Sequence, residues 1–298
     1  SGHVRIYKNI NNSWTKLVGD IDGEAAGDYS GESVNISADG SIIAIGATFN
    51  DGNGSNSGHV RVYQINTNSI TLTSQSISAS ELISLDSQFS GTVNASSVNT
   101  ITGTAADINT VYASSGISGL GNEVIIITDT SINASALINL DALTTGVVNA
   151  AAITTITGTV AQLTSVFASN TAGTITGLGN EAVTLTDTSI NASALITLDA
   201  LTTGVVNAAA ITTITGTAAD INTAYTSNAA GTIHGLGNEA VTLIDTSINA
   251  SILITLDAFT TGLINASSIT TLTGSTTDQA TVRASSGITG LPIATGPI

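Results

Sequence analysis

The strongest constraint on the fold of this chain is a repeat of 58 residues. The segment SINASALINLD starts at Ser131, SINASALITLD starts at Ser189 and SINASILITLD starts at Ser247. A weaker copy, SISASELISLD, starts at Ser76, and the residues it lacks fall in one loop. Self-similarity at a fixed period is the sequence signature of a repeat architecture. The predicted copies are 76–130, 131–188, 189–246 and 247–298.

Each copy contains two half-units with the same order of features. Apolar residues alternate with threonine in Val183-Thr184-Leu185-Thr186, which is typical of a half-buried strand. Thr217 and Asp220 have the spacing of a capping box, and Asn191 is placed to cap a helix that carries Leu195. The same capping signals recur at Thr104, Thr159, Ser275, Asn133 and Asn249. Each half-unit is therefore predicted to contain one or two strands, a short capped helix and a glycine turn.

The half-unit is too small to bury its own apolar face. Stacking on further copies would bury that face, as in solenoid proteins. We therefore expect a mainly β fold, a repeat solenoid with short capped helices. A string of small α+β domains, one for each copy, is the alternative architecture.

One asparagine recurs at the same place in every copy, at Asn94, Asn149, Asn207 and Asn265. Asparagine side chains that stack in register can form an amide ladder between strands. Each side chain can instead bond to its own backbone in a turn. The sequence favours neither interpretation over the other.

Basic residues are almost absent from the repeats. The chain has 21 acidic and 5 basic residues, which gives a net charge of -16. The bases are Arg5, Lys8, Lys16, Arg61 and Arg283, so residues 62–282 contain none. This distribution excludes the basic surface that nucleic-acid binding requires. It also disfavours binding of the chain to an anionic membrane surface. We expect no membrane insertion, and the absence of cysteine excludes disulfides.

Carboxylates recur in three columns of the repeat. The columns are Glu123, Glu181 and Glu239; Asp129, Asp187 and Asp245; and Asp141, Asp199 and Asp257. A catalytic pair of acids occurs once in an enzyme, whereas these acids occur in copy after copy. Recurrence favours capping, turn formation, solubility or repeated cation binding. We therefore expect no enzyme activity.

The first 65 residues have a different pattern, in which SGHVRIY at Ser1 recurs as SGHVRVY at Ser57. Together with Ile45-Gly46-Ala47 and the loop at 50–56, these segments resemble the FG-GAP repeat of integrin-type β-propellers. The resemblance implies a β-blade over residues 1–65, with a linker at 66–75. A propeller needs at least four blades, so we expect either further blades upstream or a blade reused as a cap.

The segment departs from the family pattern at two positions. Ile45 stands where the family often has phenylalanine, and Thr48 stands where proline is common. The chain also begins without methionine, which suggests a window from a longer protein.

The same resemblance implies a calcium site in the loop that follows Ile45-Gly46-Ala47. Asp51, Asn53 and Ser55 match the D-x-D-x-D spacing of calcium loops, and calcium is the only cofactor we expect. Calcium takes six to eight oxygen ligands, whereas this loop offers one carboxylate and has His59 at the ninth position. A plain asparagine and glycine turn is the alternative. A second acidic cluster, either a solvated loop or the site of a shared ion, contains Asp20, Asp22, Glu24 and Asp28.

The repeats also resemble those of very long surface proteins of marine bacteria, cyanobacteria especially, in segments such as ITGLGNEAVTL and TTITGTAADINTAY. This resemblance implies an extracellular or cell-surface location. We expect a non-catalytic structural segment that forms an extended scaffold or self-assembles into a filament or layer. The alternatives are a calcium-dependent adhesin or ligand-binding module, with a glycan or cell-surface ligand, and a phage fibre.

Overall fold

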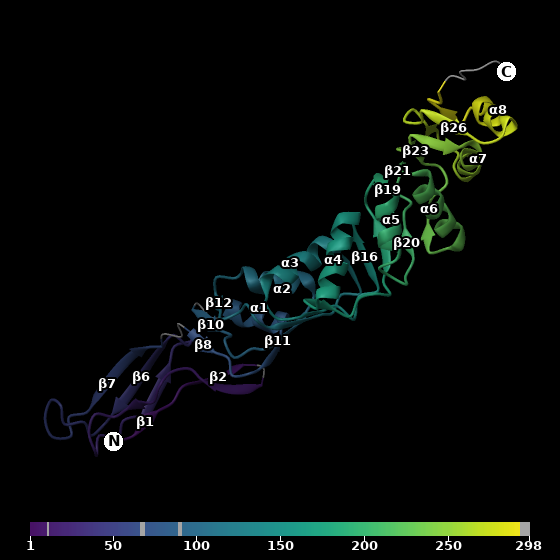
Figure 1. Cartoon of the computed structure of the whole chain (residues 1–298). Coiled ribbons are helices and arrows are strands. Elements are labelled where there is room, and N and C mark those ends of the chain that lie inside the picture. Colours follow the sequence, from purple (N-terminus) through teal and green to yellow (C-terminus); the bar gives the residue numbers. More distant parts are fainter. Residues whose placement is uncertain (11, 66–68, 89–90, 293–298) are drawn as a thin grey trace. The chain divides into compact units, whose positions relative to one another are not determined.

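The computed structural model describes residues 1–10, 12–65, 69–88 and 91–292 (Figure 1). Parts of the predicted linker (66–68) and of the fourth copy (293–298) lie outside the described residues. The described residues form mainly strands, with eight short helices and no closed barrel. They divide into two compact units. Unit 1 is Ser1–Ser74, Glu81–Ser97 and Ser114–Gly119, and unit 2 is Gln75–Ser80, Val98–Ala113 and Leu120–Ile298.

Unit 1 contains an antiparallel sheet in the order β5-β6-β7. Its strands are β5 (Ser33–Ile36), β6 (Ile42–Ala47) and β7 (His59–Gln64). Two further antiparallel pairs are β1 (His3–Val4) with β4 (Ile21–Asp22), and β2 (Tyr7–Ile10) with β3 (Ser13–Lys16). The core of this part is a cluster of Val4, Ile6, Ile43, Ile45 and Ile65. The N-terminal strand thus covers one face of β6.

The remainder of unit 1 includes three parallel strands in the order β12-β10-β8. These strands are β8 (Ser69–Thr71), β10 (Thr92–Asn94) and β12 (Ile117–Ser118).

Unit 2 is built from parallel sheets, each assembled from strands of successive half-units. The first sheet contains β9 (Ser76–Ser78), β11 (Thr100–Gly103), β13 (Val124–Ile127), β15 (Val148–Asn149) and β17 (Ile175–Thr176). The second contains β14 (Ser131–Asn133), β16 (Thr155–Gly158), β18 (Ala182–Leu185), β20 (Val206–Asn207) and β22 (Ile233–His234). The third contains β19 (Ser189–Asn191), β21 (Thr213–Gly216), β23 (Ala240–Leu243), β25 (Ile264–Asn265) and β27 (Ile288–Thr289). The last contains β24 (Ser247–Asn249) and β26 (Thr271–Thr273).

The first three sheets of unit 2 each begin at the first strand of a copy and end in the next copy. The second sheet, for example, starts at β14 in copy 131–188 and ends at β22 in copy 189–246. Strand pairing therefore crosses the boundaries between copies, which separate small domains would not show. One apolar residue from each strand lines the buried side of that sheet, and these are Ile132, Ile156, Val183, Val206 and Ile233.

The sheets overlap because the number of strands alternates between helices. Two strands, β15 and β16, lie between α3 and α4, whereas three strands, β17 to β19, lie between α4 and α5. Where three strands lie between two helices, the first of them ends one sheet and the last begins another, as β17 and β19 do. A new sheet therefore begins in every copy. Figure 1 shows the helices of unit 2 following one another along the strands. The helices of unit 2 are α2 (Ala105–Ala113), α3 (Ala134–Leu143), α4 (Val160–Ala172), α5 (Ala192–Asp199), α6 (Ala218–Ala230), α7 (Ala250–Phe259) and α8 (Thr276–Ala284). Most of α1 (Ala79–Gln88) belongs to unit 1, which takes in the chain from Glu81 to Ser97.

The predicted helix caps are confirmed. Thr159 forms a full capping box with Gln162, and the side chain of Thr217 accepts a hydrogen bond from the Asp220 amide. Asn191 caps α5 by accepting from the Ser193 amide at 2.9 Å. Asn133 and Asn249 cap α3 and α7 in the same way. Such caps each contribute about 1 kcal/mol to helix stability.

The asparagine column is explained by turn chemistry. The side-chain oxygen of Asn149 accepts from the Ala151 amide at 3.0 Å, and Asn207 accepts from the Ala209 amide at 3.1 Å. Asn207 lies beside Thr184 and His234 in the sheet, so asparagines do not stack on one another there. The amide-ladder interpretation was therefore wrong for this column.

None of the helices in the described ranges has the length and apolar character needed to cross a membrane.

Candidate functional site

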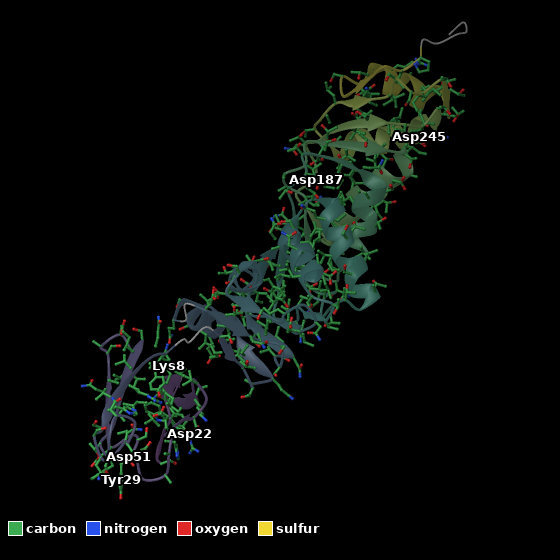
Figure 2. All side chains as sticks on the ribbon, turned by 90° about the vertical axis from the view of Figure 1, so that its left-hand side faces the viewer. Lys8, Asp22, Tyr29, Asp51, Asp187 and Asp245 are labelled. Atoms are coloured by element: carbon green, nitrogen blue, oxygen red, sulfur yellow. The ribbon has the colours of Figure 1, made fainter. Side chains whose placement is uncertain are left out.

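The predicted calcium residues lie in the exposed loop between β6 and β7, and Figure 2 labels Asp51 within it. Asp51 organises the loop itself. Its Oδ1 accepts from the Asn56 amide at 2.6 Å, and its carbonyl accepts from the Gly54 amide at 3.1 Å. Asn53 and Ser55 are exposed to solvent.

This geometry does not fit a calcium cage. One oxygen of the only carboxylate among the three residues is already bonded to the backbone, while calcium takes six to eight oxygens. Within the described residues, no three acidic or histidine side chains gather in a way that could hold a metal ion. Calcium at Asp51, Asn53 and Ser55 stays a prediction from the sequence, without support from the geometry.

The carboxylates of the second acidic cluster bond to different partners and do not converge on one point. Asp20 accepts from Arg5, with 2.9 Å between Nη2 of Arg5 and Oδ2 of Asp20, and it also pairs with Lys16. Glu24 pairs with Arg61. These carboxylates are therefore neutralised by the few basic residues of the chain.

Asp28 differs from these acids because it is buried, with 3% of its surface exposed. It accepts from the Ala25 amide at 3.0 Å and from Nδ2 of Asn50 at 2.9 Å. Asn50, also buried, donates in addition to Glu24 at 3.2 Å, and its side-chain oxygen accepts from the Gly52 amide. Asp28 and Asn50 thus fix the loop onto the body of unit 1.

A small polar hollow with a volume of about 10 Å³ lies between these residues, bordered by Asp22, Glu24, Asp28, His59 and Arg61. This is about the volume that one water molecule needs. The hollow is therefore too small for an organic ligand.

Residues 16–63 match the FG-GAP repeat family. The match covers β4, β5, β6 and nearly all of β7, and it includes both the loop with Asp51 and the buried pair Asp28 and Asn50. The FG-GAP resemblance expected from the sequence is confirmed for this segment. No curated protein and no solved structure matches the chain.

The ion pairs of Asp20 make the stability of the FG-GAP segment dependent on pH. Hydrogen bonds from Arg5, and then from Lys16, hold the pKa of Asp20 well below its usual range. A carboxylate whose pKa is lowered by folding stabilises the fold above about pH 4 and loses that effect as it becomes protonated. We expect Asp20→Asn to destabilise unit 1 at pH 6, and the difference from the parent chain to shrink as the pH falls below about 4.

Thermal unfolding followed by the fluorescence of Trp14 would measure this effect, because Trp14 is the only tryptophan and lies in β3. The control is Asp22→Asn, which changes an exposed acid outside the ion pairs found among the described residues. A constant difference between Asp20→Asn and the parent from pH 6 to pH 3 would contradict the assignment.

In unit 2, the two aspartate columns bond one half-unit to the next. Asp187 and Asp245, labelled in Figure 2, accept from the first amides of the helices in the preceding half-units, α4 and α6. Both distances are 2.7 Å, and Asp129 does the same for α2. A negative charge at a helix N-terminus is stabilising. This column therefore caps helices across half-units, whereas Asn133, Asn191 and Asn249 cap their own helices.

The second aspartate column bonds to hydroxyl groups about one half-unit further along the chain. Oδ2 of Asp141 accepts from Ser169 at 2.9 Å and from Thr174 at 3.1 Å. Asp199 accepts from Thr232, and Asp257 accepts from Ser285. These bonds tie the end of one helix to the end of the next.

The glutamate column is fully buried, which its sequence context did not reveal. Glu123, Glu181 and Glu239 each have 0% of their surface exposed. Oε2 of Glu239 accepts from the Gly237 amide at 2.8 Å and from the hydroxyl of Tyr225 at 3.0 Å. Burial raises the pKa of Tyr225 above its usual range, and the charge of Glu239 adds to this effect, so the hydroxyl stays protonated as a donor.

Copy 131–188 lacks that hydroxyl because Phe167 replaces the tyrosine. Glu181 accepts from the Gly179 amide at 2.7 Å, and its Oε1 is buried without a hydrogen-bond partner among the described residues. The carboxylate columns thus organise turns and helix ends. The sequence could have indicated the Tyr225–Glu239 pair, since Tyr112 and Glu123 recur together with it.

Proposed function

We propose that this chain is a non-catalytic structural segment of a long secreted or cell-surface bacterial protein. An FG-GAP blade precedes a repeat solenoid, and the solenoid serves as a scaffold. The observation that carries this proposal is the pairing of strands across copy boundaries. Strand pairing that continues from copy to copy sets the length and the stiffness of the repeat region, and these are the properties that a scaffold needs.

The use of the carboxylates supports the same conclusion. Asp187 caps a helix, Asp141 bonds to hydroxyls of the following half-unit and Glu181 is buried in a turn. Recurrent acids with structural partners differ from the single, accessible pair that acid–base catalysis needs. The resemblance of the repeats to bacterial surface proteins supports a location of the proposed scaffold outside the cell.

Copy number offers a test of the scaffold proposal. Duplicating residues 131–188 in place should lengthen unit 2 by two strand steps, about 10 Å along the sheet. Small-angle X-ray scattering would measure the increase, and each further duplication should add the same amount. The control is a duplication of residues 131–159, which repeats half of the period. If the full duplication left the maximum dimension unchanged, the scaffold proposal would fail.

We also propose that the chain associates with copies of itself into filaments or layers. The repeat region has few charges and exposes apolar side chains such as Ile244 and Leu263. Electron microscopy and light scattering should reveal assemblies that grow with protein concentration, measured both with calcium and with a chelator. Monomers at every concentration in both buffers would contradict self-association and leave the scaffold proposal to the copy-number test.

A further inference from the structure

Two aromatic side chains lie together on the surface of unit 1. Tyr29, which Figure 2 labels, is 61% exposed, and Phe49 is 46% exposed. The centroids of the two rings are 5.3 Å apart. Aromatic residues make up only 3% of the chain, and rings as exposed as these add little to its core. An adjacent pair of exposed rings is instead typical of a binding surface.

The backbone at Tyr29 is held in the left-handed conformation, with a φ of 54°. Gly27 and Gly31 in the same turn are also left-handed, with φ values of 96° and 93°. Glycine adopts this conformation without steric cost, whereas a bulky side chain makes it unfavourable. A tyrosine between these two glycines therefore weakens the turn. Such a residue is expected where the side chain serves binding and not folding.

Buried polar residues fix the position of both rings. Asp28 directly precedes Tyr29, and Asn50 directly follows Phe49. The buried side chains of Asp28 and Asn50 are hydrogen-bonded to each other at 2.9 Å. The carbonyl of Asp28 also accepts from the Phe49 amide at 3.4 Å. The rings are thus held by a preformed base, which lowers the entropy cost of binding a ligand.

An open hollow of about 510 Å³ lies beside Tyr29, and we call it the Tyr29 hollow. In addition to Tyr29, it is lined by Ser1, Gly2, Gly27, Ser30, Gly31 and Glu32. The carboxylate of Glu32 accepts a hydrogen bond from the hydroxyl of Thr48. None of the side chains that line the hollow is basic. Its volume is within the range of about 300–1,000 Å³ that is typical of sites for small ligands.

These groups match the chemistry of a neutral sugar. A pyranose has a face of C–H groups that can pack on an aromatic ring, and hydroxyls at its edge that can bond to polar groups. Tyr29 supplies the ring, while Glu32 and the hydroxyl of Ser30 supply hydrogen-bonding groups. The negative charge of Glu32 disfavours phosphates and acidic sugars. A peptide would need an apolar groove for its side chains, whereas glycine, serine and a carboxylate dominate this lining.

We propose that the Tyr29 hollow binds a neutral sugar unit of a polysaccharide. The sugar would stack on the exposed ring of Tyr29, with Phe49 supporting that ring, and its hydroxyls would bond to Glu32. The inference rests on unit 1 alone and is independent of the scaffold proposal, which the copy-number test decides.

Electrophoresis of the full chain through gels that contain a polysaccharide would test this site. The neutral probes are laminarin, galactomannan and xyloglucan, and the acidic probe is alginate. We expect at least one neutral probe to retard the chain and alginate to leave it unaffected. Tyr29→Gly should weaken the binding at least about tenfold, because truncating a central aromatic side chain is among the most costly changes in a binding site.

Tyr29→Gly also keeps the test interpretable, since glycine suits the left-handed backbone and unit 1 should stay folded. Circular dichroism during thermal unfolding would verify this. Phe49→Ala should weaken binding as well. The matched control is Trp14→Ala, which removes a ring that is 68% exposed in β3, outside the Tyr29 hollow. This variant should bind as the parent chain does.

Several results would overturn the proposal. The chain could pass all three neutral gels without retardation, or folded Tyr29→Gly could bind as tightly as the parent. An equal loss of binding in Trp14→Ala would point to unspecific contact with exposed rings. Stronger retardation by alginate than by the neutral probes would assign the chain an acidic ligand, and binding only to a peptide array would assign it a peptide.

Discussion

Replacing Leu253 with alanine should lower the free energy of unfolding of unit 2 by about 3 kcal/mol. Leu253 lies in α7, and none of its surface is exposed. α7 contacts both α6 and α8, so a cavity at this position weakens the contacts in both directions along the repeats. The lost free energy combines the transfer free energy of the deleted methyl groups with the cost of the cavity that remains.

The neighbouring residue supplies a matched control. Ile252 is 41% exposed, and the equivalent positions in the two preceding copies are Ala136 and Ala194. We therefore expect Ile252→Ala to change the free energy by less than about 0.5 kcal/mol. Urea unfolding followed by circular dichroism would measure both variants, and amide hydrogen exchange in α7 would localise the effect. Equal losses in the two variants would show that α7 does not pack as described.

Removing the hydroxyl of Tyr225 should destabilise unit 2, and adding one at Phe167 should stabilise it. Tyr225 donates to the buried carboxylate of Glu239 at 3.0 Å, and hydrogen bonds to charged groups contribute about 1.5–3 kcal/mol. Tyr225→Phe should lower the free energy of unfolding by about that amount, because the ring and its stacking on Phe259 are kept. Phe167→Tyr should raise it, since a hydroxyl there would donate to the buried carboxylate of Glu181, as Tyr112 donates to Oε2 of Glu123.

The two substitutions are each other's control, because they exchange the same groups at equivalent places in adjacent copies. The double variant should fall between the two single variants if the two sites act independently. Thermal and urea unfolding of the parent and the three variants would measure the effects. A destabilising Phe167→Tyr would mean that the pocket beside Glu181 has no room for the hydroxyl.

Local features of the fold could be predicted from the sequence. Thr159 with Gln162 and Asn191 before α5 were identified as caps because capping depends on residues within one turn of the helix. The strand over Ala182–Leu185 followed from its alternation of apolar residues and threonine. Because the sequence repeats, the same assignments could be made at the equivalent positions of the other copies.

Features that depend on distant contacts could not be predicted in this way. The shift of pairing between sheets depends on strands as short as Val148–Asn149, which have no pattern of their own. Likewise, the burial of Glu239 depends on Tyr225, which approaches it from another element. At the predicted calcium site, the spacing of Asp51, Asn53 and Ser55 did not reveal that Asp51 would bond to the Asn56 amide.

The alternation of two and three strands between helices has a consequence for how the gene can change. Loss or gain of one whole copy joins equivalent positions, so β18 can be followed by the strands that normally follow β23. Loss of half a copy would bring two turns of the same kind together, and one strand of each affected sheet would lose its neighbour. We therefore expect recombination between copies to be tolerated only in steps of whole copies. Natural variants of this region should differ by whole copies, with the order of strands and helices preserved at every junction.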